Sequence, residues 1–155
     1  MTSRVQLALR VPDLATSIAF YTKLFGTEPA KLRDGYANFA IADPPLKLVL
    51  IEGTAGEATR MDHLGVEVES TEAVHTATAR LGEAGLTTAE ENDTSCCYAL
   101  QDKVWVHGPG QEPWEVYVVK ADADSLAKQQ GSTCCADSAE ADTSSKEPAV
   151  AGGCC

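Results

Sequence analysis

The six cysteines of this 155-residue chain fall into three adjacent pairs, Cys96-Cys97, Cys134-Cys135 and Cys154-Cys155. Two neighbouring thiolates form a bidentate clamp for a soft, thiol-seeking ion, so the spacing indicates trivalent arsenic, cadmium or zinc. A disulfide between adjacent residues would be strained, and the spacing is not that of a secreted disulfide framework. The pattern therefore favours metal or metalloid binding. Crosslinks between pairs, incidental thiols in the last two pairs, and a first pair that simply lies in a strand are the plainer alternatives.

A second set of polar residues could hold a divalent metal. Gln6, His63 and Glu115 stand among apolar neighbours in segments that read as strands. One amide oxygen, one imidazole nitrogen and one carboxylate offer three protein ligands and leave positions for dioxygen, water or substrate. We therefore take these three as candidate metal ligands and catalytic residues, for iron, manganese, nickel or zinc rather than calcium. Each alone has a plainer interpretation. His63 could be a strand histidine with its hydrogen bonds satisfied, and Glu115 could be an exposed strand residue or pair with Lys47. Gln6 could be a polar surface residue on a half-buried strand.

A weak internal repeat of about 57 residues predicts two similar structural units, whose strands would position these side chains. In each half an alternating strand is followed by a helix, the first beginning at Pro12-Asp13 and ending at Gly26. The second helix begins at Ser70-Thr71 and ends at Gly85. Strands are predicted at residues 5–11, 36–41, 46–51, 63–68, 87–91, 97–101, 104–106 and 114–119.

The predicted fold class is α+β, with two βαβββ modules over about residues 3–53 and 61–120. Pairing the modules about a pseudo-twofold axis aligns Gln6 with His63 and Lys47 with Glu115. The two first strands and the two last strands would then bring these side chains together.

Composition supports one compact domain over residues 3–120. The chain is 44% hydrophobic, with a formal charge of −11, which disfavours nucleic acid and anionic membranes as partners. The start of the sequence contains no long apolar run typical of a signal peptide or a membrane span, so we expect a cytoplasmic protein. Residues 121–155 are rich in Ala, Asp, Ser, Thr and Gly, and we predict a disordered, acidic tail that carries Cys134, Cys135, Cys154 and Cys155.

Two βαβββ modules with candidate ligands on their first and last strands resemble the vicinal oxygen chelate superfamily, which includes glyoxalase I, bleomycin-resistance proteins and extradiol dioxygenases. Within it, the chain closely resembles the cadmium-inducible and carbon-arsenic lyase branch. The most specific segments are Cys96-Cys97-Tyr98 and Asp102-Lys103-Val104-Trp105. Residues 5–14, 36–41, 62–66, 91–98 and 101–106 carry the remaining similarity.

The resemblance implies an Fe(II)- and dioxygen-dependent enzyme that cleaves the carbon-arsenic bond of trivalent organoarsenicals, such as methylarsenite or aromatic arsenicals, and releases arsenite. By position, Gln6, His63 and Glu115 match the iron ligands, and Cys96 and Cys97 match the thiols that bind arsenic. Many relatives have histidine where this chain has Gln6, and a neutral oxygen donor should bind iron more weakly.

Two other functions fit the same residues. The thiol pairs could sequester cadmium or arsenite beside a vestigial metal site, or the chain could be a glyoxalase-like or dioxygenase-like enzyme acting on a carbon substrate. The latter chemistry does not need the cysteine pair. The preferred arsenical, the metal bound in the cell, the role of the tail cysteines, the choice between monomer and homodimer, and supporting roles for Lys47, Lys103 and Tyr98 stay open.

Overall fold

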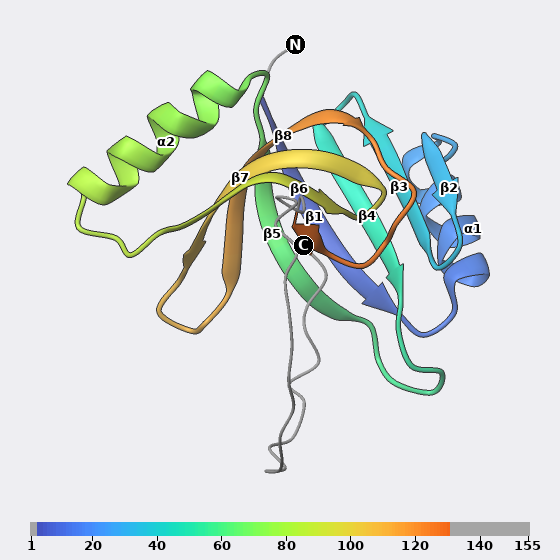
Figure 1. Ribbon diagram of the computed structural model, residues 1–155. Coiled ribbons are helices and arrows are strands. Elements are labelled where there is room, and N and C mark those ends of the chain that lie inside the picture. The colour runs from blue at the N-terminus through green and yellow to red at the C-terminus, as the bar shows by residue number, and fades with distance from the viewer. Residues whose placement is uncertain (1–2, 131–155) are drawn as a thin grey trace, which may run out of the picture.

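The computed structural model describes residues 3–130, which form one mixed β-sheet with two helices packed on it. The strand order is β2-β3-β4-β1-β5-β8-β7-β6-β9. The first module comprises β1 (Arg4–Val11), α1 (Leu14–Phe25), β2 (Lys31–Arg33), β3 (Tyr36–Ile41) and β4 (Leu46–Glu52). The second comprises β5 (Arg60–Glu67), α2 (Thr71–Glu83), β6 (Ala89–Cys96), β7 (Ala99–His107) and β8 (Pro113–Asp122), and β9 (Gln129–Gln130) follows it. Figure 1 shows the sheet curled, with α1 and α2 outside it at opposite ends.

The two modules meet along their first strands, which confirms the predicted pairing of two βαβββ units. β1 pairs with β5 in antiparallel fashion, and each of these strands also pairs in parallel with the last strand of its own module. In this register Gln6 lies opposite Lys47 on one side and Gly65 on the other, and Gly65 in turn lies opposite Glu115. The candidate ligands therefore occupy neighbouring strands at the centre of the sheet.

Both helices begin at the predicted residues. Asp13 caps α1 by accepting a hydrogen bond from the Thr16 amide, and Ser70 caps α2 by accepting one from the Ala73 amide. Gly26 ends α1 at a φ of 63°, in the left-handed region that favours glycine. The helices cover the outer face of the sheet, α1 over β3 and β4 and α2 over β7 and β8. The inner face is left for a cavity.

The second module departs from the prediction around the cysteine pair. The separate strands expected at residues 97–101 and 104–106 are one strand, β7, and β6 runs on to Cys96. The charged residues Asp102 and Lys103, which fell between the two predicted strands, are buried inside β7. Cys97 and Tyr98 form the two-residue turn between β6 and β7, with φ values of 51° and 59°. The short strand β2, which the βαβββ pattern requires, was not located among the predicted strands.

The packed chain extends past Lys120, where we predicted the flexible tail to begin. β8 continues to Asp122, and the Cys97 and Tyr98 amides donate hydrogen bonds to the carbonyls of Leu126 and Ser125. The Leu126 side chain packs against the same apolar cluster as the cysteine pair. The tail pairs Cys134-Cys135 and Cys154-Cys155 lie outside the described residues. Within residues 3–130, neither helix is long and apolar enough to cross a membrane.

Candidate functional site

Three polar side chains converge on one point at the centre of the sheet. Gln6, His63 and Glu115 come from β1, β5 and β8, and each is at most 4% exposed. Gln6 Nε2 lies 3.1 Å from His63 Nε2 and 2.8 Å from Glu115 Oε1, and the last two atoms are 3.3 Å apart. The structure thus brings together all three residues that we took as candidate ligands.

These distances fit a facial set of metal ligands. Ligand bonds of roughly 2.1 Å at right angles place neighbouring donor atoms roughly 3.0 Å apart, and the three observed distances lie on both sides of that value. The Gln6 amide now directs its nitrogen to this point. Rotation about the last side-chain bond exchanges its nitrogen and oxygen, which are nearly equal in size. The described residues contain no group of three His, Cys, Asp or Glu side chains that could hold a metal ion, so a metal here depends on the Gln6 oxygen.

Gly65 provides the space in which the side chains of Gln6 and Glu115 come into contact. Gly65 lies between Gln6 and Glu115 on the central strand β5. A Cβ atom there would stand 3.1 Å from Glu115 Cγ and 3.2 Å from Gln6 Nε2, closer than ordinary contact. A glycine inside a strand often marks such a close approach, and here it accommodates the candidate metal ligands.

His63 is oriented by a carboxylate behind it. Its Nδ1 donates to Asp62 Oδ1 at 2.7 Å, and Arg10 Nε donates to the other oxygen of Asp62 at 2.6 Å. Burial would lower the pKa of His63, but the hydrogen bonds to Asp62 and Glu115 outweigh it and raise that pKa. With its proton on Nδ1, the ring presents Nε2 to the shared point, as metal-binding histidines generally do.

Glu115 and Gln6 also have partners behind them. Lys103 Nζ donates to Glu115 Oε2 at 2.7 Å, and the Tyr117 hydroxyl donates to Gln6 Oε1. Burial would raise the pKa of Glu115, but attraction to Lys103 and hydrogen bonding from His63 lower it to about 2. The carboxylate is therefore ionised at neutral pH, as a metal ligand must be.

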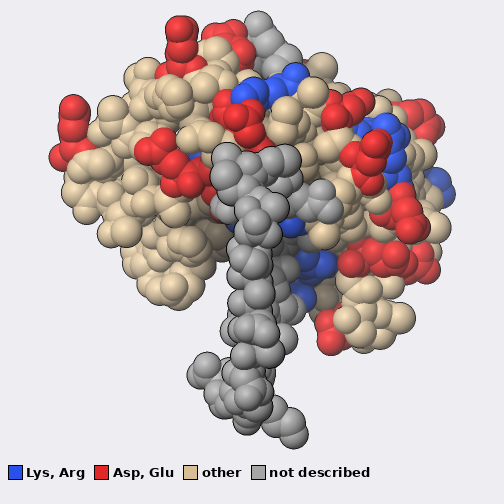
Figure 2. Space-filling model, in the orientation of Figure 1, with Lys and Arg blue, Asp and Glu red and all other residues tan. Residues whose placement is uncertain are grey.

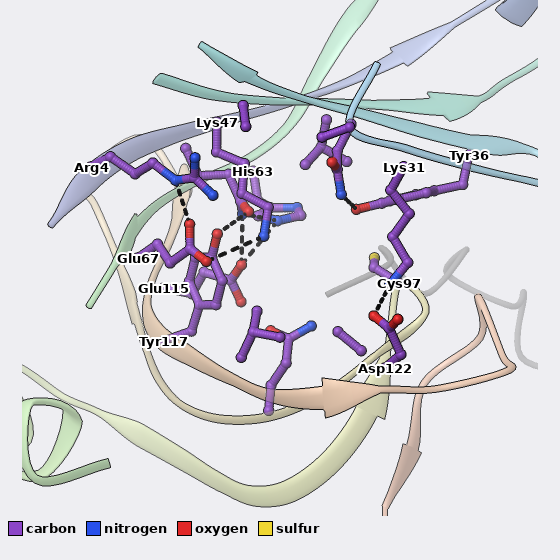
Figure 3. A pocket seen from close by; sticks show the side chains of 18 residues that line it. Arg4, Lys31, Tyr36, Lys47, His63, Glu67, Cys97, Glu115, Tyr117 and Asp122 are labelled. Atoms are coloured by element: carbon purple, nitrogen blue, oxygen red, sulfur yellow. Dashed lines mark hydrogen bonds and ion pairs between the residues drawn. The ribbon is translucent and has the colours of Figure 1, made fainter. Parts of the chain in front are cut away.

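Cys97, one member of the cysteine pair, faces this cluster across a cavity of about 240 Å³. Figure 3 shows Cys97 on the side of the cavity opposite His63 and Glu115. Cys96 lies fully buried behind it, with the two sulfurs 3.7 Å apart. Two bonds of about 2.3 Å, the length of a zinc-thiolate bond, would span that gap at an angle of roughly 107°. At 3.7 Å the two sulfurs are not bonded to each other, but Cys96 takes part in a disulfide bond in the structure. The two cysteines can therefore act together as a clamp once that disulfide is reduced.

The cavity walls carry charged side chains in pairs. Arg4 Nε donates to Glu67 at 2.6 Å, and Lys31 lies 2.6 Å from Asp122. Lys47 stands farther from Glu67, at 3.7 Å, and burial lowers its pKa in spite of the nearby carboxylates, which raise it. Outside the cavity, Figure 2 shows acidic side chains spread over the visible face. Within the cavity, each of these basic groups has a carboxylate nearby.

Sequence reasoning identified the three converging residues and the cysteine pair but missed several of their supports. Gly65 and Tyr117 were read only as strand residues, and Asp62 was given no role. Their signals were a glycine inside a strand, a tyrosine two residues after Glu115, and an acid beside His63. Lys103 was named as a supporting group without a partner, and the structure places it on Glu115.

Comparison with known proteins agrees with this arrangement. Residues 4–116 match the model of the Glyoxalase/Bleomycin resistance protein/Dioxygenase superfamily. The chain is 68% identical to a trivalent organoarsenical cleaving enzyme of Thermomonospora curvata over 153 residues, 99% of each chain. It is 62% identical to the cadmium-induced protein CadI of Mycobacterium tuberculosis over 126 residues, 80% of this chain and 81% of that protein.

Among solved structures, homoprotocatechuate 2,3-dioxygenase of Brevibacterium fuscum has the same fold, with a TM-score of 0.56 at 22% identity. The match covers 79% of this chain and 38% of that one. The family model spans most of the domain, including the cysteine pair, and the relative from Thermomonospora curvata matches nearly the whole chain. This chain belongs to the glyoxalase, bleomycin resistance protein and dioxygenase superfamily.

Proposed function

We propose that this protein cleaves the carbon-arsenic bond of trivalent organoarsenicals, such as methylarsenite or aromatic arsenicals, and releases arsenite. One observation carries the proposal: a set of side chains suited to a metal faces Cys97 across one cavity, and Cys96 lies directly behind Cys97. The 68% identical relative is named for that reaction.

The cysteine pair would bind the substrate. In the reduced protein, the thiols of Cys96 and Cys97 replace the two hydroxyl groups of R–As(OH)₂, which forms two sulfur-arsenic bonds and releases two water molecules. Since the hairpin turn fixes both sulfurs and Cys97 lines the cavity, we expect the organic group R to extend into the cavity, toward Gln6, His63 and Glu115. This fixed orientation lowers the entropic barrier to reaction at that group.

The residues opposite would hold the metal. His63 Nε2, Glu115 Oε1 and, after rotation of its amide, Gln6 Oε1 supply three ligands suited to Fe(II). Bound Fe(II) would supply the redox chemistry with dioxygen that breaks the carbon-arsenic bond. The burial of all three side chains excludes bulk water from this side of the cavity.

Arsenic speciation tests the proposal directly. The reduced protein is loaded with Fe(II) without oxygen, mixed with methylarsenite, and then exposed to air. We expect catalytic release of arsenite that requires iron, oxygen and the cysteine pair, so that Cys96→Ser/Cys97→Ser abolishes it. Methylarsenite that stays bound and unconverted would instead support sequestration. Arsenite release that survives loss of the cysteine pair would overturn the role proposed for Cys96 and Cys97, and activity on a carbon substrate alone, unchanged by their loss, would favour a glyoxalase-like or dioxygenase-like enzyme.

A further inference from the structure

Lys103 is a buried cation beside the candidate metal site. Its side chain is 0% exposed, and its ammonium lies 2.7 Å from Glu115 Oε2. The rings of Trp105 and Tyr117 stand 5.4 and 5.8 Å from the same ammonium. In the register of β7 and β8, Lys103 pairs with Tyr117 and Trp105 pairs with Glu115, so the ammonium reaches Glu115 diagonally between aromatic walls.

The two oxygens of Glu115 therefore serve different partners. Oε1 faces Gln6 and His63, at 2.8 and 3.3 Å, whereas Oε2 is held by Lys103. If Glu115 Oε2 turned toward the point that Gln6 and His63 share, the buried Lys103 ammonium would lose its carboxylate partner and could not replace it with water. A second bond from Glu115 to a metal would therefore require breaking the ion pair between Lys103 and Glu115 Oε2.

We propose that Lys103 is a positioning residue that restricts Glu115 to one bond with the metal. The inference rests on the proposed metal site and adds to it. Three single bonds from the protein leave three positions of an octahedral metal for water, dioxygen or substrate. A chelating carboxylate would close one of them, so Lys103 sets the number of open positions.

Water bound to Mn(II) provides the test, because its ¹⁷O hyperfine signal counts the waters on the metal. Lys103→Met removes the hydrogen-bond donor with little change in size, and Lys103→Gln keeps a donor without the charge. We expect the Met variant to bind Mn(II) with one water fewer than the parent protein, and the Gln variant to keep the parent's count. An unchanged count in a folded Met variant would overturn the inference. Loss of one water from both variants would also overturn it, because the positive charge of Lys103, and not its hydrogen bond, would then control how Glu115 binds the metal.

A measurement on the unaltered protein covers the case in which Lys103→Met does not fold. The antisymmetric and symmetric carboxylate stretches lie far apart when one oxygen binds a metal and closer together when both do. Infrared difference spectra on adding Mn(II), with ¹³C-labelled glutamate and Glu115→Gln to assign the bands, should show the wide separation. A narrow separation would overturn the role of Lys103. Failure of the parent to bind Mn(II) or Fe(II) would instead overturn the metal site itself.

Discussion

Gly65 separates Gln6 from Glu115 on the central strand, and its replacement by alanine tests whether the site depends on their contact. The new methyl group would stand 3.1 Å from Glu115 Cγ, 3.2 Å from Gln6 Nε2 and 3.3 Å from the Glu115 carbonyl oxygen. The carbonyl belongs to the backbone of β8, which pairs with β5 at this position and cannot retreat alone. The two side chains must therefore move apart.

Two effects of Gly65→Ala follow from these distances. Overpacking of this kind destabilises a folded protein by about 1–3 kcal/mol, which urea unfolding of the metal-free protein would measure. The 2.8 Å contact between Gln6 and Glu115 must also lengthen, which spoils the spacing of the donor atoms. We expect Fe(II) and Mn(II) to bind roughly 10–100-fold more weakly, as when a group that orients a metal ligand is lost.

Gly82→Ala is the matched control. Gly82 lies in α2, and no atom would stand within 4 Å of an added Cβ, so the same methyl group there should stabilise the helix by about 1 kcal/mol. Metal affinity should stay that of the parent. A folded Gly65→Ala protein that binds Fe(II) as tightly as Gly82→Ala would refute the claim that the spacing of Gln6 and Glu115 defines the site.

Three further outcomes are expected. Tyr117→Phe leaves a buried acceptor unpaired and should lower the free energy of unfolding by about 1–3 kcal/mol, whereas Tyr21→Phe on α1 should change it little; equal effects in urea would contradict this. His63→Gln should weaken Fe(II) binding more than about 100-fold in calorimetry, and His75→Gln, on the exposed face of α2, should not. Burial would raise the pKa of Asp102, but hydrogen bonds from the backbone, a hydroxyl and an ammonium lower it. Its stabilisation is therefore complete above about pH 4 and is lost as the pH falls through the folded pKa, so Asp102→Asn should flatten the acid side of the stability curve; parallel curves would contradict this.

The sequence was sufficient to predict the convergence of Gln6, His63 and Glu115 because their positions follow from strand periodicity and the internal repeat. Once two similar modules pair along their first strands, residues at matching positions must share a face of the sheet. β1 and β5 pair in that way, and β8 lies next to β5. This part of the site depends on backbone register alone.

Interactions that cross the repeat could not be predicted in the same way. Lys103 has no special spacing from Glu115, and its role arises because β7 and β8 place the two side chains diagonally. Asp102 and Lys103 were left between two predicted strands for the same reason: their partners on other strands are invisible in the sequence. The turn at Cys97 and Tyr98 escaped notice because it lacks the glycine or asparagine that usually takes positive φ in such hairpins.

The turn at Cys97 and Tyr98 depends on contacts with distant parts of the chain, whereas the strands on the opposite side of the cavity do not. Non-glycine residues in the left-handed region cost roughly 1–2 kcal/mol each, so Cys97 and Tyr98 need contacts that hold them there. The returning chain supplies such contacts, because the carbonyls of Leu126 and Ser125 accept hydrogen bonds from the Cys97 and Tyr98 amides. The Tyr98 hydroxyl adds a bond of 2.7 Å to the carbonyl of Asp34, in the other module. The backbone of the candidate metal ligands, by contrast, lies within hydrogen-bonded strands and needs no such support, while contacts such as those of Asp62 and Lys103 orient only the side chains. The placement of the cysteine pair is therefore set by contacts outside its own hairpin, and that of the metal ligands by the sheet itself.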